Sequence, residues 1–124
     1  MKNTLKKLLA IVMVLTMLLA FAGCGSKKVI TVGYTIYEPM NYEDADGNLI
    51  GYDTDLAKAV FENLGYEVLF QEIVWENKYT DLNSGTIDCV WNGFTCNTKD
   101  EDGVARADKV DFSYNYMENR QVVV

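Results

Sequence analysis

The sequence predicts an α/β fold, in which a mostly parallel sheet is covered by helices on both faces. Segments of strand composition alternate with segments of helical pattern along residues 29–124, and glycines follow the helical segments. The chain has 124 residues, of which 49% are apolar and one is proline. This composition fits one globular domain with a modest core and argues against disorder.

The first elements are a strand and a hairpin. Residues 29–34 form an apolar run of strand length. Asp46-Gly47 stands between Tyr42-Glu43 and Leu49-Ile50, and this dipeptide is typical of a tight turn between antiparallel strands. We therefore expect a small hairpin between the first strand and the helix that follows.

A helix is predicted over residues 53–64. Asp53 or Thr54 is expected to cap its start, and Gly65 ends it. Apolar residues recur at intervals of four and predict its apolar face: Leu56, Val60 and Leu64. Asp53 and Asp55 together resemble a carboxylate pair for acid/base work, but at a helix start we interpret them as capping and dipole-stabilising residues.

The second half of the chain continues the alternation of strand and helix. A strand over 67–73, with Val68 and Phe70 on one face, precedes a short helix over 77–84. Gly85 is the residue type that ends a helix in the left-handed conformation, and the apolar run 87–91 predicts a buried strand. Within that run, Trp91 is expected in the core, and Asp88 is expected to be a structural hydrogen-bonding acid beside the strand start. Residues 121–124 have strand composition.

A polar loop directly follows the strand predicted over 87–91. In open α/β sheets, ligands bind beyond the carboxyl ends of the strands, and Asn92, Gly93 and Thr95 lie at such an end. Arg106, further along, has the side chain best shaped to hold a carboxylate through two parallel hydrogen bonds. A surface ion pair is the alternative role for this arginine.

The amino terminus has the pattern of an export signal. A basic start with Lys2, Lys6 and Lys7 precedes fifteen mostly apolar residues, 8–22, which is short for a membrane span. The small residues before Cys24 resemble a lipobox, although Phe21 stands where leucine is usual. We expect a lipoprotein signal peptide over residues 1–23, lipidation of Cys24 with a palmitate-type acyl chain, and a tether over 24–28. An ordinary secretory signal and an uncleaved anchor helix are the alternatives.

Charge and cysteine content exclude several classes of function. Without residues 1–23 the chain has 8 basic and 18 acidic residues, a net charge of −10, so nucleic acid is not an expected partner. The chain contains no histidine, and Cys89 and Cys96 lack the spacing of a zinc site. We expect no metal, no cofactor and two reduced thiols, with a disulfide between them as the alternative.

Four segments in order resemble the family 3 solute-binding proteins of amino-acid ABC importers. They read YEPMNYED from Tyr37, GNLIGYDTDLAKAV from Gly47, LNSGTIDCVWNGFT from Leu82 and RADKVDFS from Arg106. The resemblance implies a periplasmic-binding-protein-like lobe over residues 29–124. Members of this family have two such lobes joined by crossing strands, with the ligand held between them. This chain ends close to the first crossing, so the second lobe is absent from the sequence.

The resemblance also implies roles for individual residues. Arg106 and Thr95 match positions that hold the α-carboxylate of an amino acid, and Asn92 and Gly93 match positions that contact the ligand through main-chain groups. Further residues match positions that sandwich the side chain or line the site through the backbone: Tyr37, Trp75 and Phe94. The binding site is therefore expected to comprise Tyr37, Trp75, Asn92, Gly93, Phe94, Thr95 and Arg106.

One departure from the family pattern lies between Thr95 and Arg106. The connection from Cys96 to Ala105 is longer than the usual short link and contains Asp100, Glu101 and Asp102. These carboxylates either compete for Arg106 in the empty site or form a solvated loop tip, and we favour the tip. A calcium loop is not expected, because Thr98 and Lys109 occupy the positions of its first and last acidic ligands.

The function implied by the resemblance is capture of a free amino acid outside the membrane and its delivery to an ABC permease. The protein is expected to be a lipid-anchored, extracytoplasmic monomer that performs no chemistry. Two alternatives use the same scaffold: an enzyme similar to cyclohexadienyl dehydratases, and the extracellular sensor domain of a receptor. Residues 29–124 contain no acid that we assign to a catalytic cleft. The sequence does not identify the amino acid.

Overall fold

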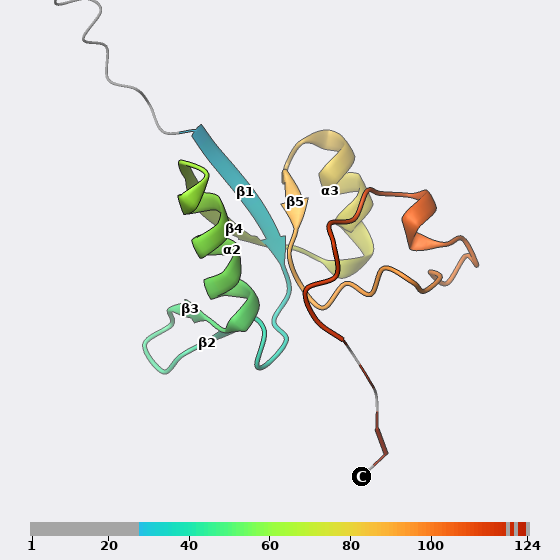
Figure 1. The fold of residues 1–124 in the computed structure, drawn as a ribbon, viewed down its shortest axis with the longest axis horizontal. Helices are drawn as coiled ribbons and strands as arrows, with labels where there is room; N and C mark the ends of the chain where they lie inside the picture. The colour runs from blue at the N-terminus through green and yellow to red at the C-terminus, as the bar shows by residue number, and fades with distance from the viewer. Residues whose placement is uncertain (1–27, 119, 121, 124) are drawn as a thin grey trace, which may run out of the picture.

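The computed structural model of the chain describes residues 28–118, 120, 122 and 123. Its centre is a three-stranded parallel sheet with the order β4-β1-β5 (Figure 1). The strands are β1 (Lys28–Tyr34), β4 (Tyr66–Glu72) and β5 (Cys89–Val90). The predicted parallel α/β arrangement is confirmed.

The strand β1 is the central strand of the sheet. All seven of its residues pair in parallel with β4, from Lys28 opposite Tyr66 to Tyr34 opposite Glu72. On its other side only Val32 and Gly33 pair with β5, so β5 is shorter than the strand predicted over 87–91. Two backbone hydrogen bonds extend this pairing at both ends. The Asp88 amide donates to the Thr31 carbonyl at 2.9 Å, and the Trp91 amide donates to the Gly33 carbonyl at 3.0 Å.

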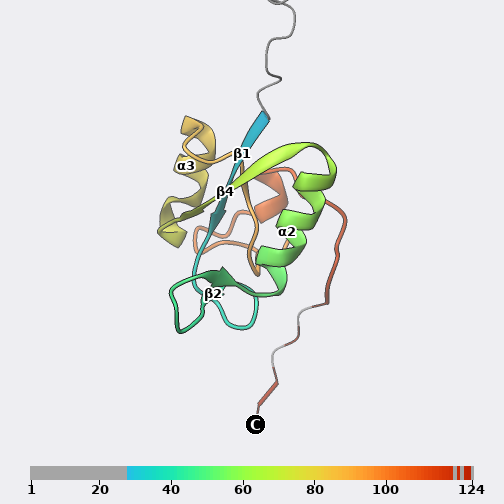
Figure 2. The ribbon, with the colours of Figure 1, turned by 90° about the vertical axis from the view of Figure 1, so that its left-hand side faces the viewer.

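Helices cover both faces of the sheet, as predicted. Figure 2 shows α2 (Tyr52–Asn63) and α3 (Lys78–Ser84) on opposite sides of β1 and β4. A 3-10 turn, η1 (Trp75–Asn77), leads into α3, which ends at Gly85 in the left-handed conformation with φ 73°. The predicted role of Gly85 is therefore confirmed.

The start and the buried face of α2 differ from the prediction. The residue before the first turn is Gly51, and no side chain caps the helix. Asp53 and Thr54 are instead buried, together with Ala57. Val60 and Leu64 are 37% and 63% exposed, so the predicted apolar face is wrong. The buried face of the helix is small and polar because Thr54 bonds to Asn41 and Ile50, and Asp53 accepts a hydrogen bond from Tyr116.

Close packing between β1 and the chain before β5 fixes the core. Val32, Ala57 and Ile87 are almost fully buried. A Cβ atom added at Gly33 would lie 2.6 Å from Ile87 Cδ1, so a larger residue there would displace Ile87. Asp88 accepts a hydrogen bond from the Thr31 amide at 2.7 Å, which confirms its predicted structural role.

The predicted hairpin forms between β2 (Tyr42–Glu43) and β3 (Leu49–Ile50). Its turn is organised by Asp44, whose carboxylate accepts hydrogen bonds from the amides of Asp46 and Asn48, both at 2.9 Å. Gly47 has φ 82°, as a turn of this kind requires.

Several predictions concern parts of the chain that the structure does not describe. The signal peptide, Cys24 and the tether up to residue 27 lie outside the described residues, and Lys28, the last residue of the predicted tether, is the first residue of β1. Of the strand predicted over 121–124, residues 121 and 124 lie outside them too, and Val122 and Val123 are not in a strand. Within the described part of the chain, no helix is long and apolar enough to cross a membrane.

Candidate functional site

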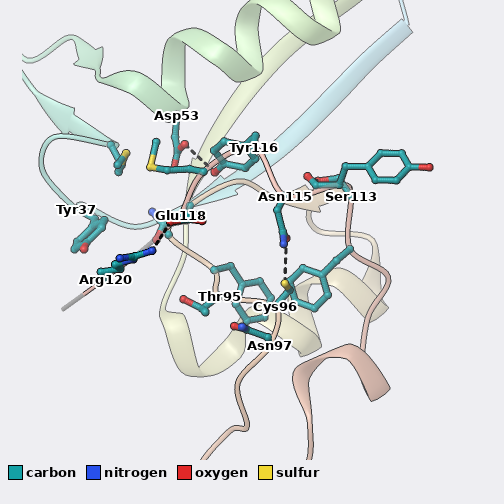
Figure 3. Close-up of a pocket in the computed structure, with 17 residues that line it drawn as sticks. Tyr37, Asp53, Thr95, Cys96, Asn97, Ser113, Asn115, Tyr116, Glu118 and Arg120 are labelled. Atoms are coloured by element: carbon teal, nitrogen blue, oxygen red, sulfur yellow. Dashed lines mark hydrogen bonds and ion pairs between the residues drawn. The ribbon is translucent and has the colours of Figure 1, made fainter.

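A cavity of about 590 Å³ lies beyond the carboxyl ends of β1 and β5 (Figure 3). Two segments form most of its wall: the loop 92–97, which follows β5, and the extended segment 112–118. The remaining lining residues come from the turn after β1, the start of α2 and the end of the chain: Tyr37, Met40, Asp53 and Arg120. The cavity is therefore at the edge of the sheet that the sequence predicted.

A chain of buried polar side chains holds the loop 92–97 in place. Asn92 donates its amide hydrogens to the Thr35 carbonyl and to Asn41 Oδ1, both at 2.9 Å. Asn41 in turn donates to Thr54 Oγ1 at 3.0 Å, and Thr54 donates to the Ile50 carbonyl. Asn41 and Thr54 are fully buried and Asn92 is 9% exposed. The side chain of Asn92 is therefore structural, while its residue still lines the cavity.

Gly93 and Tyr37 meet at the cavity wall. A Cβ atom at Gly93 would lie 3.1 Å from Tyr37 Cε1, so the absence of a side chain allows the ring to pack on the loop backbone. The backbone of Tyr37 exchanges two hydrogen bonds with the backbone of Asn41. Tyr37 is 49% exposed. An apolar or planar group that entered the cavity could contact this ring.

Phe94 is the centre of an aromatic cluster behind the loop. Its ring lies 5.1 Å from Trp75 and 5.0 Å from Phe112, measured between ring centroids. Two cations also pack on aromatic faces here. The Arg106 guanidinium lies 5.0 Å from the Phe94 ring, and Lys78 Nζ lies 4.6 Å from the ring of Trp75. Phe94 lines the cavity, but Trp75 and Arg106 do not.

Arg106 is held by two oxygen atoms of residues that precede it in the chain, one from Asp100 and one from Thr95. Its Nε donates to Asp100 Oδ1 at 2.8 Å, and its Nη1 donates to the Thr95 carbonyl at 3.3 Å. The interpretation of Asp100 as part of a solvated tip is therefore wrong, because its side chain is only 13% exposed. Asp102 is 55% exposed and does lie at a tip, where it pairs with Lys109 at 2.7 Å.

Asp100 is bound by two further donors. The Tyr79 hydroxyl and Lys109 Nζ, the latter at 3.0 Å, both donate to its Oδ2. The hydrogen bond from Tyr79 is the main cause that holds the pKa of Asp100 well below its usual range, and Arg106 and Lys109 act in the same direction. Burial, followed by this contact with Asp100, raises the pKa of Tyr79 to about 12.

The second wall of the cavity is the segment 112–118, which no motif assigned to the site. Tyr116 donates its hydroxyl to Asp53 Oδ1 at 2.8 Å and packs against Trp91 with ring centroids 5.9 Å apart. Burial raises the pKa of Asp53, although the nearby Tyr116 hydroxyl and Trp91 indole both lower it. Within the described residues, Asp53 Oδ2 and Trp91 Nε1 are buried atoms without a hydrogen bond of normal geometry.

These contacts correct two assignments made from the sequence. Asp53 is a buried acid at the cavity and not a helix cap, because Tyr116 and Trp91 cover it. Trp91 is only partly buried, at the edge of the core, where it packs on Phe61 with ring centroids 5.7 Å apart. Phe112 and Ser113 lie within the matched segment RADKVDFS, but no residue of 112–118 carried a signal of its own that assigned it to the site.

In the part of the chain that the structure describes, the cysteines and acids do not form a metal site. Cys89 and Cys96 are free, and burial raises the pKa of Cys89 to about 11. Cys96 Sγ donates to Asn115 Oδ1 at 3.1 Å across the cavity wall. Among the residues that the structure describes, no group of three or more histidine, cysteine or acidic side chains could hold a metal ion.

The structure brings five of the seven predicted site residues together at the cavity: Tyr37, Asn92, Gly93, Phe94 and Thr95. Trp75 and Arg106 lie behind this wall, where both contact Phe94 and Arg106 also contacts Thr95. The lining residues that the sequence did not assign are Met40, Asp53, Cys96, Asn97, the residues 112–118 and Arg120. Met40 lay within a matched segment, YEPMNYED, but carried no signal of its own.

Comparisons with known proteins agree on one family. Residues 30–124 match the family model of the bacterial extracellular solute-binding proteins, family 3. The L-cystine-binding protein TcyA of Bacillus subtilis is 39% identical over 108 residues, which cover 84% of this chain and 37% of TcyA. The arginine-binding extracellular protein ArtP of the same organism is 30% identical over 129 residues, covering 97% of this chain and 48% of ArtP.

Solved structures give the same result for the fold. A substrate-binding protein of an ABC uptake transporter from Streptococcus pneumoniae, solved with bound histidine, has a TM-score of 0.64 and 44% identity, covering 74% of this chain and 35% of that one. A cyclohexadienyl dehydratase of Pseudomonas aeruginosa is a more distant relative, 29% identical over 73 residues, or 59% of this chain and 26% of the enzyme. The chain thus spans less than half the length of the relatives described.

Proposed function

The chain belongs to the bacterial extracellular solute-binding proteins, family 3, and on this premise we propose that it supplies the first lobe of a receptor for a free amino acid. The receptor captures the amino acid outside the cytoplasm and delivers it to an ABC permease in the membrane. The relatives described above include binders of cystine, arginine and histidine, which share only the amino-acid backbone. The proposal is therefore for the class of ligand and not for one amino acid.

The observation that carries this proposal is the way in which the loop 92–97 is held. The side chain of Asn92 holds the loop, because it is buried and donates a hydrogen bond to Asn41. Residues 93–97 line the cavity. A cavity of about 590 Å³ is within the usual range for a small-molecule site. A loop that is already held in shape loses little conformational entropy when a ligand binds.

We assign the two ends of the ligand as follows. The α-carboxylate lies against Thr95 and is neutralised by Arg106, whose guanidinium already contacts the Thr95 carbonyl at 3.3 Å. Arg106 does not itself line the cavity, and its Nη end is the part that contacts a lining residue, Thr95. The ligand side chain lies against Tyr37, and Trp75 supports Phe94 from behind.

The membrane anchor is part of the same proposal. Cys24 follows the predicted signal peptide, and acylation there would hold the receptor at the cell membrane as a monomer. Incorporation of labelled palmitate into the wild-type protein, and its loss in Cys24→Ser, tests this assignment. Incorporation that persists in Cys24→Ser would contradict it.

A ligand panel tests the binding function directly. The protein purified in the form that its host produces is titrated with each of the twenty common amino acids and with cystine, and its Tm is followed. At least one of them is expected to raise the Tm, because a ligand that binds only the folded state stabilises it. Arg106→Gln, which keeps most of the side chain but removes the charge, is expected to abolish that rise. The absence of any rise in the wild-type protein would contradict the function.

The second candidate is a dehydratase, because Asp53 is an acid at the cavity with a raised pKa. Asp53 is only 1% exposed and is covered by Tyr116, which favours a structural role over proton transfer to a substrate. Prephenate turnover by the purified protein, lost in Asp53→Asn, would establish the enzyme in place of the receptor.

A further inference from the structure

The longer connection between Thr95 and Arg106 places a carboxylate on the arginine itself. Asp100 lies in this connection, and a local backbone pairing of Lys99 with Ala105 folds it back toward Arg106. The Asp100 amide donates to the Val104 carbonyl at 3.0 Å, and the Arg106 amide donates to the Thr98 carbonyl at 3.1 Å. The position of Asp100 relative to Arg106 is therefore set by the backbone.

The contacts of Arg106 leave one edge of its guanidinium available. A guanidinium has five N–H donors, one on Nε and two on each Nη. The Nε hydrogen is taken by Asp100 Oδ1 and one Nη1 hydrogen by the Thr95 carbonyl. A carboxylate can bind two parallel donors either along the Nε edge or between the two Nη atoms. With Nε occupied, the hydrogens that have no acceptor among the described contacts are one on Nη1 and both on Nη2, so a ligand carboxylate would bind at the Nη end of the guanidinium.

Asp100 is held too firmly to leave when a ligand arrives. Its second oxygen accepts from Tyr79 and from Lys109, so three side chains bind one carboxylate that is 13% exposed. The same donors lower the pKa of Asp100, which therefore stays charged at neutral pH. A ligand carboxylate that displaced it would have to break all of these contacts.

We propose that Asp100 is a positioning residue for ligand recognition: it holds Arg106 by Nε and presents the Nη edge of the guanidinium to the carboxylate of the ligand. Asp100 stays on Arg106 in both the empty and the occupied site and is not a competitor that the ligand expels. This inference rests on the proposed amino-acid-binding function.

The test compares Asp100→Asn with Asp102→Asn in the protein as its host produces it. Asp102 lies in the same connection and also pairs with Lys109, but it is exposed and does not contact Arg106. For the amino acid that binds best in the panel, Asp100→Asn is expected to raise the Kd about tenfold, a loss of about 1.4 kcal/mol. Asp102→Asn is expected to stay within about twofold of wild type.

Two further measurements separate positioning from general damage to the fold. The α-carboxamide of the same amino acid lacks the charge that Arg106 recognises, so its Kd is expected to change little in Asp100→Asn. In an Arg106→Lys background, Asp100→Asn is expected to add no further loss, because the lysine has no Nε edge to orient. Tyr79→Phe, which removes one donor from Asp100, is expected to weaken binding in the same direction by a smaller factor.

The outcomes are distinct from those that test the function. If the wild-type protein binds no amino acid, the function fails and this inference fails with it. If the wild-type protein binds, then tighter or unchanged binding by Asp100→Asn overturns the inference, and tighter binding would mark Asp100 as a competitor. An equal loss for the free acid and its carboxamide would also overturn it. Should Asp100→Asn not fold, Tyr79→Phe decides by the same criteria.

Discussion

Tyr116 donates its phenolic hydrogen to the buried carboxylate of Asp53 at 2.8 Å, although 63 positions separate the two residues in the chain. The bond joins the extended segment 112–118 to the first turn of α2. Tyr116 also packs on Trp91, directly before the loop 92–97. This contact therefore ties together both walls of the cavity and the helix beside them.

Tyr116→Phe is expected to destabilise the protein by about 1–2 kcal/mol, because it leaves both oxygens of a buried carboxylate without a hydrogen bond of normal geometry. Urea denaturation measures this difference. Tyr114→Phe is the matched control, since Tyr114 is 98% exposed, and it is expected to change stability by less than about 0.5 kcal/mol. Equal effects of the two variants would show that the bond to Asp53 contributes nothing.

The pH dependence of this difference follows from Asp53. Its pKa in the folded protein is raised above the ordinary value of 3.8, so the folded state takes up a proton first as the pH falls. Ionised Asp53 therefore lowers stability at neutral pH, and stability is regained as the pH falls through its folded pKa. The Tyr116 hydroxyl favours the ionised form, so its removal raises the pKa further.

The loss of unfolding free energy in Tyr116→Phe relative to wild type is accordingly expected to be largest near neutral pH. It is expected to shrink as Asp53 becomes protonated. Urea midpoints of both proteins measured from pH 7 down to about pH 4 give this difference, in which the other titrating groups cancel. A deficit that grows toward low pH would rule out Asp53 as its source.

Asn92→Ala is expected to cost about 2–3 kcal/mol, because it leaves the Thr35 carbonyl and Asn41 Oδ1 without their donor. Asn97→Ala is the control. Asn97 lines the same cavity, and among the described contacts its side chain makes no hydrogen bond. Thermal unfolding of the two variants without ligand compares them. If Asn97→Ala destabilised the protein as much, the polar chain could not be what holds the loop.

Gly51→Ala is expected to cost at least about 3 kcal/mol. Gly51 has φ 127°, and a Cβ there would lie 2.3 Å from the Met40 carbonyl oxygen. Gly47→Ala, with φ 82° and open space around its Cβ, bears the backbone strain without the clash and is expected to cost about 1–2 kcal/mol. Denaturation midpoints distinguish the two, and a smaller effect at Gly51 would contradict the close approach of Met40 to α2.

The pattern of elements was predictable because local signals agreed with the fold. Gly85 ends α3, Asp46-Gly47 turns the hairpin, and each of the two longer strands begins and ends within one residue of its prediction. The face of α2 was not predictable from spacing alone. The spacing of Leu56, Val60 and Leu64 indicates a helix, but the buried side is chosen by partners of Thr54 and Asp53 that lie elsewhere in the chain.

The candidate site likewise has one part that was predictable from the sequence and one part that was not. Residues 92–95 were identified because they directly follow a strand, and their place at its carboxyl end determines where they lie. The opposing wall, 112–118, has no regular secondary structure and no periodicity, so the sequence gives no local signal for it. The contact of Asp100 with Arg106 depends on a turn of the chain that brings the two residues together. The acidic composition of residues 100–102 alone suggested an exposed loop tip.

The polar chain from Thr35 through Asn92 to Thr54 has a consequence for how ligand preference could change during evolution. The loop is fastened by a side chain that lies behind it, and the contacts from Arg106 and Thr98 to Thr95 reach its carbonyl oxygen. Among the described contacts, the side chains of Thr95 and Asn97 make no hydrogen bond that holds the loop, whereas Cys96 bonds to Asn115. Mutations at Thr95 and Asn97 can alter the chemistry offered to a ligand while the scaffold beneath them persists, so a lineage could acquire a new preference without first losing its fold.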